Sequence, residues 1–211
     1  MDERAQAFTL EGFIGAILLV SAVLFALQAT VVTPKTVGSL DADTRDTLRA
    51  EADDVLRTAA TDRDSDLSRA VRYWASSEQR FHGATDRRIG YGDEGLPSML
   101  FNGAFGQAFK SRGYSFNILI VYRGNQSADA QNATGSERMV WMGPPAAEAV
   151  TVSQRVTLYD NETLTAPGAT GRELWEYDTD PSNGERGFYP IPEAAPNSPI
   201  YNVVEVRVTV W

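Results

Sequence analysis

The longest apolar run of the chain lies close to its N-terminus. No charged side chain occurs from Gly12 to Pro34, and the stretch from Phe13 to Val32 is rich in Leu, Ile, Val, Ala and Phe. A bilayer core of about 30 Å requires roughly 20 helical residues, and a backbone inside hydrocarbon must satisfy its own hydrogen bonds. The run therefore predicts a transmembrane helix over residues 12–34. A buried core helix is the alternative, but such helices are rarely so long and so free of charge.

A helical period continues beyond this run. Two apolar stripes recur every three to four residues with Asp and Arg between them, and the acids of Asp62–Asp66, which separate the stripes, can cap a second helix. The first stripe consists of Leu48, Ala52, Val55, Leu56 and Ala59, and the second of Leu67, Ala70, Val71 and Trp74. A short third helix is expected around Phe105 and Phe109. We expect the amphipathic helices to pack on a sheet.

The period changes to two in the second half of the chain. Alternation of apolar and polar residues is typical of antiparallel strands with one buried face, and it predicts strands at residues 116–122, 139–141, 150–158 and 204–210. The Gly- and Pro-rich stretch Thr165–Pro199 predicts a long surface loop before the last strand.

These patterns together predict an α+β fold. A long N-terminal helix, with a membrane half and an amphipathic half, would pack on an antiparallel β-sheet of about four strands. The expected divisions are a leader and cleavage region at 1–11, a transmembrane helix at 12–34, an amphipathic helical region at 35–82 and an extracellular sheet domain at 83–211.

Composition argues against some classes of partner and some kinds of cross-link for such a protein. The formal net charge is -9 and the isoelectric point is about 4.7, which argues against nucleic acid, because clustered Lys and Arg hold its phosphates. Cysteine is absent, so neither disulfides nor thiolate metal sites are expected. Lys35 and Lys110 are the only lysines. Acid excess, scarce Lys and no Cys together resemble proteins of salt-loving archaea.

Three kinds of N-terminal segment contain an apolar run of this kind. A cleaved secretory signal has a basic start and an apolar region of about 7–15 residues, whereas Met1–Arg4 is net acidic and the run here is longer. An uncleaved signal anchor is physically adequate. The third kind is a class III signal, in which a peptidase cuts before the apolar helix and leaves that helix on the mature protein.

The residues before the helix resemble the class III signal of type IV pilins, the family that includes archaellins and pseudopilins. The archaeal form has a basic residue followed by Gly or Ala at the cut, and Arg4-Ala5 matches it. The resemblance implies that a prepilin peptidase cleaves the chain, and we place the cut between Ala5 and Gln6. It also implies the pilin plan, in which a long N-terminal helix is followed by an antiparallel sheet.

Glu11 is the most informative single residue of the segment. Phe8-Thr9-Leu10-Glu11 resembles the pilin pattern of Phe-Thr-Leu, one apolar residue and Glu, but lacks that apolar residue, which leaves cleavage after Gln6 or Ala7 open. A carboxylate at the edge of a membrane helix is costly, and the resemblance implies that Glu11 pairs with the N-terminal amine of a neighbouring subunit. The alternative is an acid at headgroup level that reaches water. The small residues Gly12 and Gly15 would let neighbouring helices approach closely.

Candidate catalytic and metal-ligating residues are few. His82 is the only histidine, and the Gly-x-Ser-x-Gly elbow of serine hydrolases is missing, so His82 is expected near a helix C-terminus rather than in catalysis. Asp178–Glu185 resembles a calcium loop, but its Gly is seventh rather than sixth, and an ordinary acidic turn is favoured. Asp93-Glu94 is likewise interpreted as a solvated turn. We expect no enzymatic activity, no cofactor and no metal.

Three sequons point to an exported surface. Asn125, Asn132 and Asn161 each begin an Asn-x-Ser/Thr triplet in an expected loop, where a transferase can reach them. We therefore expect glycosylation at these positions.

Two hypotheses of function follow. The first is a structural pilin-like subunit, anchored in the cell membrane with its C-terminal domain extracellular and assembled into a surface filament for adhesion or secretion. Its partners would be membrane lipid, a prepilin peptidase and other pilin-like subunits. The alternative is a single-pass, membrane-anchored extracellular binding module that forms no filament.

Overall fold

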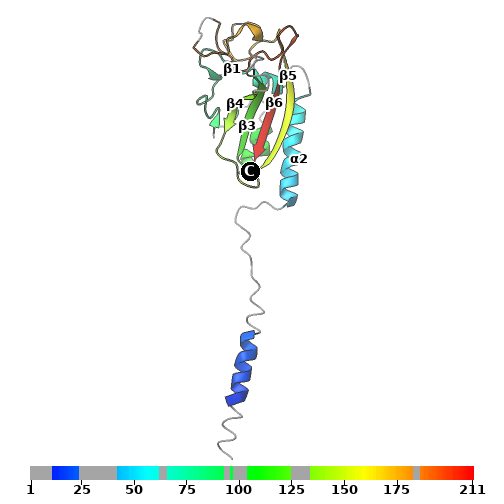
Figure 1. The fold of residues 1–211 in the computed structure, drawn as a ribbon, viewed down its shortest axis with the longest axis vertical. Helices are drawn as coiled ribbons and strands as arrows, with labels where there is room; N and C mark the ends of the chain where they lie inside the picture. The colour runs from blue at the N-terminus through cyan, green and yellow to red at the C-terminus, as the bar shows by residue number, and fades with distance from the viewer. Residues whose placement is uncertain are drawn as a thin grey trace, which may run out of the picture. The chain divides into compact units, whose positions relative to one another are not determined.

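The computed structural model describes residues 11–23, 42–61, 66–92, 96, 104–124, 134–182 and 186–211. The chain divides into two compact units, Met1–Ser39 and Leu40–Trp211. A helix over residues 11–23 represents the first unit, and all the other helices and strands belong to the second (Figure 1). The second unit is called the C-terminal domain below.

The helix of residues 11–23 carries apolar side chains around its whole circumference. All its residues are exposed, and the exposed fraction is 64% for Phe13, 65% for Leu18 and 70% for Leu19. The apolar run continues in the sequence to residue 34, but residues 24–34 lie outside the described part of the chain. Among the helices that the structure describes, none combines the length and the apolar character of a membrane span.

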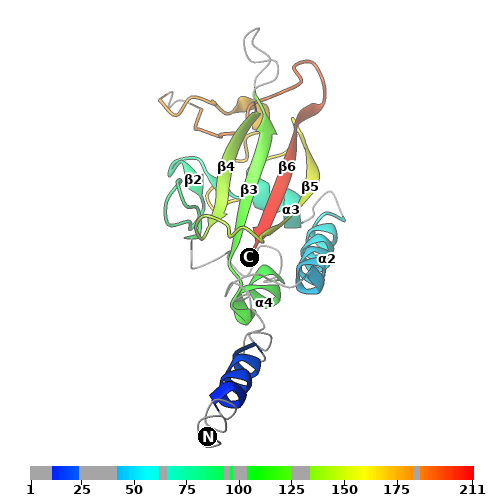
Figure 2. The same cartoon turned by 60° about the horizontal axis from the view of Figure 1, so that its bottom comes forward.

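The C-terminal domain is built on a four-stranded antiparallel sheet in the order β4-β3-β6-β5 (Figures 1 and 2). The strands are β3 (Phe116–Arg123), β4 (Thr134–Trp141), β5 (Val150–Tyr159) and β6 (Ile200–Val210). The alternating pattern predicted each of them, although β4 and β6 begin several residues earlier than expected. The last strand of the chain is therefore a central strand, paired with β3 on one side and β5 on the other.

Strand β4 contains a bulge that buries two consecutive residues. Ile118 pairs with Val140, whereas Leu119 pairs with Arg138, so Met139 is an extra residue on β4. Met139 and Val140 are both fully buried. A bulge disrupts the regular alternation, which explains why the sequence pattern showed only the end of this strand.

A close backbone approach covers part of the outer edge of β4. Tyr91 donates its N–H to the Met139 carbonyl at 2.9 Å, and Gly90 forms a bridge with Val140. Gly90 has a φ of 62°, and a Cβ there would lie 2.1 Å from the Met139 oxygen. Only glycine fits this position, and the contact protects an otherwise open sheet edge.

Helices cover one face of the sheet. Helix α2 (Ala42–Ala59) buries Leu48, Ala52, Leu56 and Ala59 and packs mainly against β5, beside which it lies in both views (Figures 1 and 2). These residues form the predicted stripe at helical spacing. Helix α3 (Asp66–Val71) buries Leu67, Ala70 and Val71. Helix α4 (Ala104–Ala108) and the 3-10 helix η3 (Lys110–Arg112) follow further along the chain.

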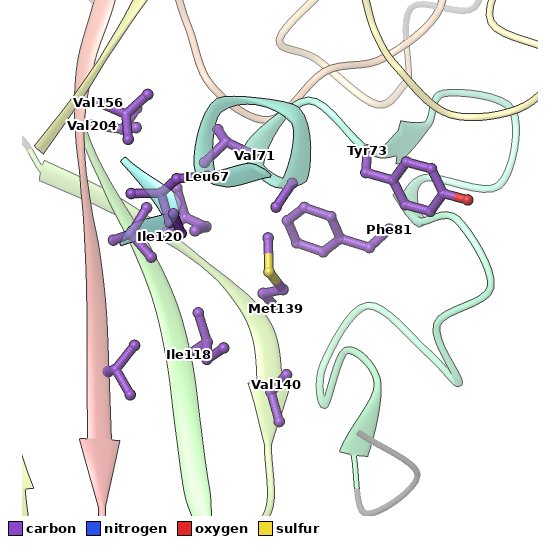
Figure 3. Close-up of a cluster of buried hydrophobic side chains, with 14 of the residues drawn as sticks. Leu67, Val71, Tyr73, Phe81, Ile118, Ile120, Met139, Val140, Val156 and Val204 are labelled. Carbon is purple, nitrogen blue, oxygen red and sulfur yellow. The ribbon is translucent and has the colours of Figure 1, made fainter. Parts of the chain in front are cut away.

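The core lies between these helices and the inner face of the sheet. Figure 3 shows Leu67 and Val71 of α3 beside the sheet residues Ile120, Val156 and Val204, all of which are less than a tenth exposed. Ring packing continues the core toward α4, because Phe105 lies 5.7 Å and Phe109 6.3 Å from the Phe116 ring, measured between centroids.

The segment between β5 and β6 is not the surface loop that its Gly and Pro content predicted. It contains the short 3-10 helix η4 (Leu174–Glu176), and its buried side chains include Leu174, Tyr177, Phe188, Tyr189 and Ile191. Two tyrosine hydroxyls make this burial possible by donating to backbone carbonyls. Tyr189 donates to Val71 at 3.2 Å, and Tyr201 of β6 donates to Ile191 at 2.6 Å.

A short hairpin replaces the expected end of the second helix. Strand β1 (Trp74–Ala75) pairs antiparallel with β2 (Arg80–Phe81). Trp74 was expected on α3, but α3 ends at Val71. The Trp74 ring instead packs edge-on against Phe81 and Phe188, with centroids 5.2 and 5.9 Å away.

The prediction of one long N-terminal helix packed on the sheet is wrong. The helix beside the sheet is α2, which belongs to the C-terminal domain, whereas the helix of residues 11–23 belongs to the other compact unit. The two helices have different surfaces. Helix α2 combines a buried stripe with a face of Asp and Arg, while the helix of residues 11–23 has no such charged face. The type IV pilin plan does not describe this fold.

Candidate ligand-binding cleft

A cleft of about 430 Å³ opens between the β1–β2 hairpin and the segment that connects β5 to β6. This volume lies within the usual range of small-molecule sites, roughly 300–1,000 Å³. Its walls come from two parts of the chain that are distant in sequence. The polar and charged side chains on these walls include Ser77, Glu78, His82, Thr170, Arg172 and Arg186.

The hairpin wall is tied to the opposite wall by side-chain hydrogen bonds. Trp74 is fully buried and donates its Nε1–H to the Phe188 carbonyl at 2.9 Å. Gln79 has a φ of 54°, in the left-handed region that closes the turn, and its amide donates to the Pro181 carbonyl at 3.1 Å. The width of the cleft is therefore set by fixed contacts rather than by free loops.

Gly187 lets the second wall approach the hairpin. Its φ is 82°, and a Cβ at this position would lie 2.5 Å from Ser76 Oγ. The Gly187 carbonyl accepts from the Asp178 N–H at 2.9 Å. The buried Ser76 hydroxyl has no hydrogen-bond partner within the described part of the chain, so the junction of the two walls contains an unsatisfied polar atom.

Two arginines give the cleft a positive charge. Arg172 donates from one guanidinium nitrogen to the Arg186 carbonyl at 2.7 Å. Over the described ranges, no carboxylate forms an ion pair with either guanidinium. Glu78 also lines the cleft, but Arg80 holds its carboxylate with two hydrogen bonds, at 2.9 and 2.7 Å. The uncompensated charge of the cleft is therefore positive, in a chain whose net charge is -9.

His82 lies on the cleft and not at the helix C-terminus that we expected. It follows β2, and its ring stands edge-on to Tyr73 with centroids 5.5 Å apart. Its N–H donates to the Tyr73 carbonyl at 3.0 Å, and its carbonyl accepts from the Tyr91 hydroxyl at 2.8 Å. These bonds fix its backbone and leave the half-buried imidazole on the cleft wall.

Arg87, whose side chain is 39% exposed, connects the sheet to the β1–β2 hairpin and to the β5–β6 segment. Arg87 forms an ion pair with Glu137 of β4, at 2.5 Å, and its guanidinium lies 4.7 Å from the Phe188 ring centroid and 5.8 Å from that of Trp74. Cation–π contacts of a partly exposed arginine add about 0.5–1 kcal/mol to such an ion pair. The arrangement holds the hairpin, the β5–β6 segment and β4 together, which is a structural role.

Acidic residues gather near the start of the β5–β6 segment. Burial, and secondly the charge of Glu173, raise the pKa of Asp160, while burial and the charge of Asp160 raise the pKa of Glu193. Within the ranges that the structure describes, no group of three or more His, Cys, Asp or Glu side chains is arranged to hold a metal ion.

The segment Asp178–Glu185, which resembles a calcium loop, is described only in part, because residues 183–185 are outside the described ranges. Asp180 accepts hydrogen bonds from the Ser182 hydroxyl and the Ser182 N–H, at 2.7 and 2.8 Å, and these bonds lower the pKa of the Asp180 carboxyl. This is the hydrogen bonding of an ordinary Asx turn.

The predicted N-terminal sites are described only in part. Arg4, Ala5 and Gln6 lie outside the described residues, while Glu11, Gly12 and Gly15 are exposed positions of the helix of residues 11–23. Apart from the helix's own backbone and the neighbouring residues, no described atom lies within 4 Å of a Cβ built on Gly12 or Gly15. The roles in cleavage and assembly stay predictions.

One of the three predicted glycosylation sites is described. Asn161 is exposed in a turn directly after β5, and the third residue of its sequon, Thr163, accepts from Arg72 through its carbonyl at 2.9 Å. Asn125, Asn132 and the acidic pair Asp93-Glu94 lie outside the described ranges.

Sequence reasoning missed the cleft. Arg172 and Arg186 lie in a stretch interpreted as a surface loop, and Ser77 and Glu78 in a stretch interpreted as helical. No motif or spacing connects these two segments, because their proximity depends on the pairing of Trp74 with Phe188. The Gly and Pro content of the β5–β6 segment indicated a loop, but it did not indicate that buried aromatic residues pack this segment against the β1–β2 hairpin.

Comparison with known proteins identifies a family for nearly the whole chain. No curated protein and no solved structure matches the chain. A family model described as a family of unknown function, DUF7288, matches residues 4–210. That match includes the N-terminal apolar helix, the sheet and both walls of the cleft. The chain therefore belongs to the DUF7288 family.

Proposed function

We propose that this chain is a membrane-anchored surface protein, which presents its C-terminal domain outside the cell as a binding module. The apolar N-terminal segment would act as the anchor. No enzymatic function is proposed, because no hydrogen bond within the described residues joins a serine of the cleft to the His82 imidazole.

One observation carries this proposal: the large apolar side chains exposed in the described structure lie almost all in the helix of residues 11–23. They are Phe13, Ile14, Ile17, Leu18, Leu19, Val20 and Val23, with Trp175 in the C-terminal domain. A contiguous exposed apolar surface marks a site of membrane or protein interaction. The sequence carries the same apolar character on to Val32 without a charge, which favours lipid as the partner.

Membrane fractionation of the full-length chain tests the anchor. Two arginines in one apolar helix each oppose insertion by roughly 3 kcal/mol, so the double variant Leu18→Arg and Val20→Arg should move from the membrane pellet to the soluble fraction. Thr58→Arg, on the exposed face of α2, is the matched control and should stay in the pellet. Wild-type protein that is released by washing at high salt, without detergent, would refute the anchor.

A second candidate function is a filament subunit of the pilin type. The observation that favours it is the sequence Arg4-Ala5 ahead of Glu11 and the apolar helix. Cleavage between Ala5 and Gln6 would create an amine within one or two helical turns of Glu11. Pairing of that amine with Glu11 of a neighbouring subunit would offset the cost of placing the acid at the membrane edge and would set the subunit register.

The intact mass of protein isolated from native membranes tests this second function. A mature chain that begins at Gln6 is expected, and changing Arg4 and Ala5 together should block cleavage while insertion continues. Glu11→Gln keeps size and polarity but removes the charge, so filaments in sheared surface fractions should decrease while membrane association stays. A wild-type mass that includes residues 1–5 would exclude the filament function and leave the anchored module in place.

A further inference from the structure

We propose that the cleft between the β1–β2 hairpin and the β5–β6 segment binds an acidic sugar, that is, a carbohydrate unit carrying a carboxylate. This inference goes beyond the proposed anchoring, because the cleft lies entirely within the C-terminal domain. Its test therefore gives the same answer whether or not the chain is anchored.

The charge of the cleft selects an anion. Arg172 uses one of the five guanidinium N–H donors for the Arg186 carbonyl, and the exposed Arg186 guanidinium has no ion-pair partner among the described residues. Glu78 does not oppose an anion strongly, because Arg80 neutralises it through two hydrogen bonds. The planar fork of arginine binds carboxylates and phosphates in a bidentate manner, and the polar walls described next favour a carboxylate that is carried on a sugar.

The uncharged polar groups on the walls favour a ligand with hydroxyls. Ser77 and Thr170 line the cleft and offer hydroxyls that donate and accept, and His82 lines it as well. The Thr170 hydroxyl already shares a hydrogen bond with the Tyr177 hydroxyl, at 3.3 Å, and retains capacity for a second partner. Side chains that both donate and accept hydrogen bonds suit the hydroxyls of a sugar.

The aromatic residues of the cleft argue against a nucleotide. Trp74, Tyr177 and Phe188 line it, but their exposed fractions are only 1%, 7% and 3%. A base needs an open aromatic face on which to stack, whereas the Trp74 and Phe188 rings contact each other and Arg87, and the Tyr177 ring contacts Tyr189. Binding must therefore come from charge and hydrogen bonds at the polar rim, which a carboxylated sugar provides.

The walls are preorganised for binding. Hydrogen bonds from Trp74 to Phe188 and from Gln79 to Pro181 join the two walls, and Gly187 packs directly on the hairpin at Ser76. A site whose walls are already fixed loses little conformational freedom when a ligand enters. Weak polar contacts can then produce measurable affinity.

The single histidine provides a direct readout of occupancy. His82 is the only histidine of the chain and lines the cleft, so a histidine-labelled sample gives one set of imidazole NMR signals. The full-length chain, in a polyoxyethylene detergent that contains no sugar, is titrated with trigalacturonate, maltotriose and inorganic phosphate. Saturable shifts of the His82 signals with millimolar trigalacturonate, and none with maltotriose or phosphate, are the expected result.

Variants of the two arginines assign the shift to the cleft. Arg186→Gln should weaken trigalacturonate binding by about tenfold, the usual effect of losing one charge-assisted hydrogen bond. Arg172→Gln should weaken it at least as much. Arg88→Gln is the matched control, since it removes the same charge from an exposed position outside the cleft, and it should change the affinity by less than about twofold because distant surface charges are screened.

Three outcomes would overturn the assignment. Equal shifts with phosphate would mean that the site recognises charge alone, and equal shifts with maltotriose would mean that the carboxylate is not recognised. Unchanged binding in the Arg186→Gln variant, whose side chain makes no hydrogen bond within the described structure, would place the sugar elsewhere. Because Arg186 is exposed, this variant is expected to fold like the wild type, and its thermal unfolding midpoint checks that it does.

Discussion

The helix of residues 11–23 and helix α2 use apolar residues in opposite ways. In α2, Leu48 and Leu56 are at most 2% exposed and contact the sheet, whereas Leu18 and Leu19 of the N-terminal helix are 65% and 70% exposed. Helix α2 obtains its stability from packing within the protein, whereas the helix of residues 11–23 must obtain it from its surroundings. A substitution in each should therefore be detected in a different measurement.

Truncation of one leucine in each helix tests this comparison most strongly. Leu56→Ala should lower the free energy of unfolding of the C-terminal domain by about 2–5 kcal/mol, because it leaves a cavity in a packed core. Leu18→Ala should change it by less than about 0.5 kcal/mol. Denaturant unfolding of the full-length protein in detergent, followed by tryptophan fluorescence, measures both. A comparable loss for Leu18→Ala would show that the first helix belongs to the folded core.

Two ion pairs, Glu137–Arg87 and Glu78–Arg80, can be compared in the same manner. Glu137→Gln should cost about 1–2 kcal/mol, because it removes the charge of a carboxylate that is only 8% exposed and forms an ion pair with Arg87. Glu78→Gln breaks an ion pair that is about a third or more exposed on both sides, so it should cost less than about 1 kcal/mol. Thermal unfolding of the two variants gives the difference. Equal costs would mean that burial of the Glu137 carboxylate does not strengthen its ion pair with Arg87.

Replacing one glycine with alanine in each region should again give opposite effects on stability. Gly187→Ala should destabilise the C-terminal domain by about 1–2 kcal/mol, because the residue has a positive φ and the new Cβ meets Ser76 Oγ. Gly15→Ala meets no atom within 4 Å and should increase the stability of its helix by up to about 1 kcal/mol. Circular dichroism and domain unfolding, recorded on the same samples, distinguish the two effects. A domain destabilised by Gly15→Ala would contradict the division into units.

The smallest expected effect concerns acids at the surface of the domain. The folded-state pKa of Asp160 is raised, so this carboxyl favours the folded state below its ordinary pKa near 4 and loses that contribution as pH rises through the folded pKa. Asp160→Asn should therefore unfold at a higher temperature than wild type at pH 7, and the advantage should disappear in acid.

Glu205 provides the control of opposite sign. The hydrogen bond from Arg207 lowers the pKa of Glu205, so its contribution is present above the ordinary pKa and is lost as pH falls through the folded pKa. Glu205→Gln should be less stable than wild type at pH 7 and equal to it in acid. Unfolding midpoints between pH 3 and 7, at constant salt, test both signs, and two parallel curves would contradict the assignment.

The strands and α2 could be predicted from sequence because their apolar residues have a regular period. Val204, Val206 and Val208 alternate along β6, and all are fully buried. The β5–β6 segment could not be predicted, because Tyr177, Phe188 and Tyr189 follow no period and are buried by contacts with residues far away in sequence. The two-residue strands at Trp74 and Arg80 are too short to produce a pattern.

The error about the N-terminal helix has a different cause. Periodicity describes the environment of each residue but not the continuity of the backbone between two stretches. An apolar run and an amphipathic stripe were adjacent, so we joined them into one helix. The structure assigns them to separate units. The cleft shows the same limit, since Arg172 and Arg186 become a site only through the tertiary position of Gly187.

The central position of β6 has a consequence for how the protein is made. Strands β3 and β5 have no partner for their facing edges until residues 200–210 arrive between them. A ribosome or a translocation channel therefore releases nearly the whole domain before its sheet can close. Such late closure exposes two strand edges to chaperones or to aggregation during that interval.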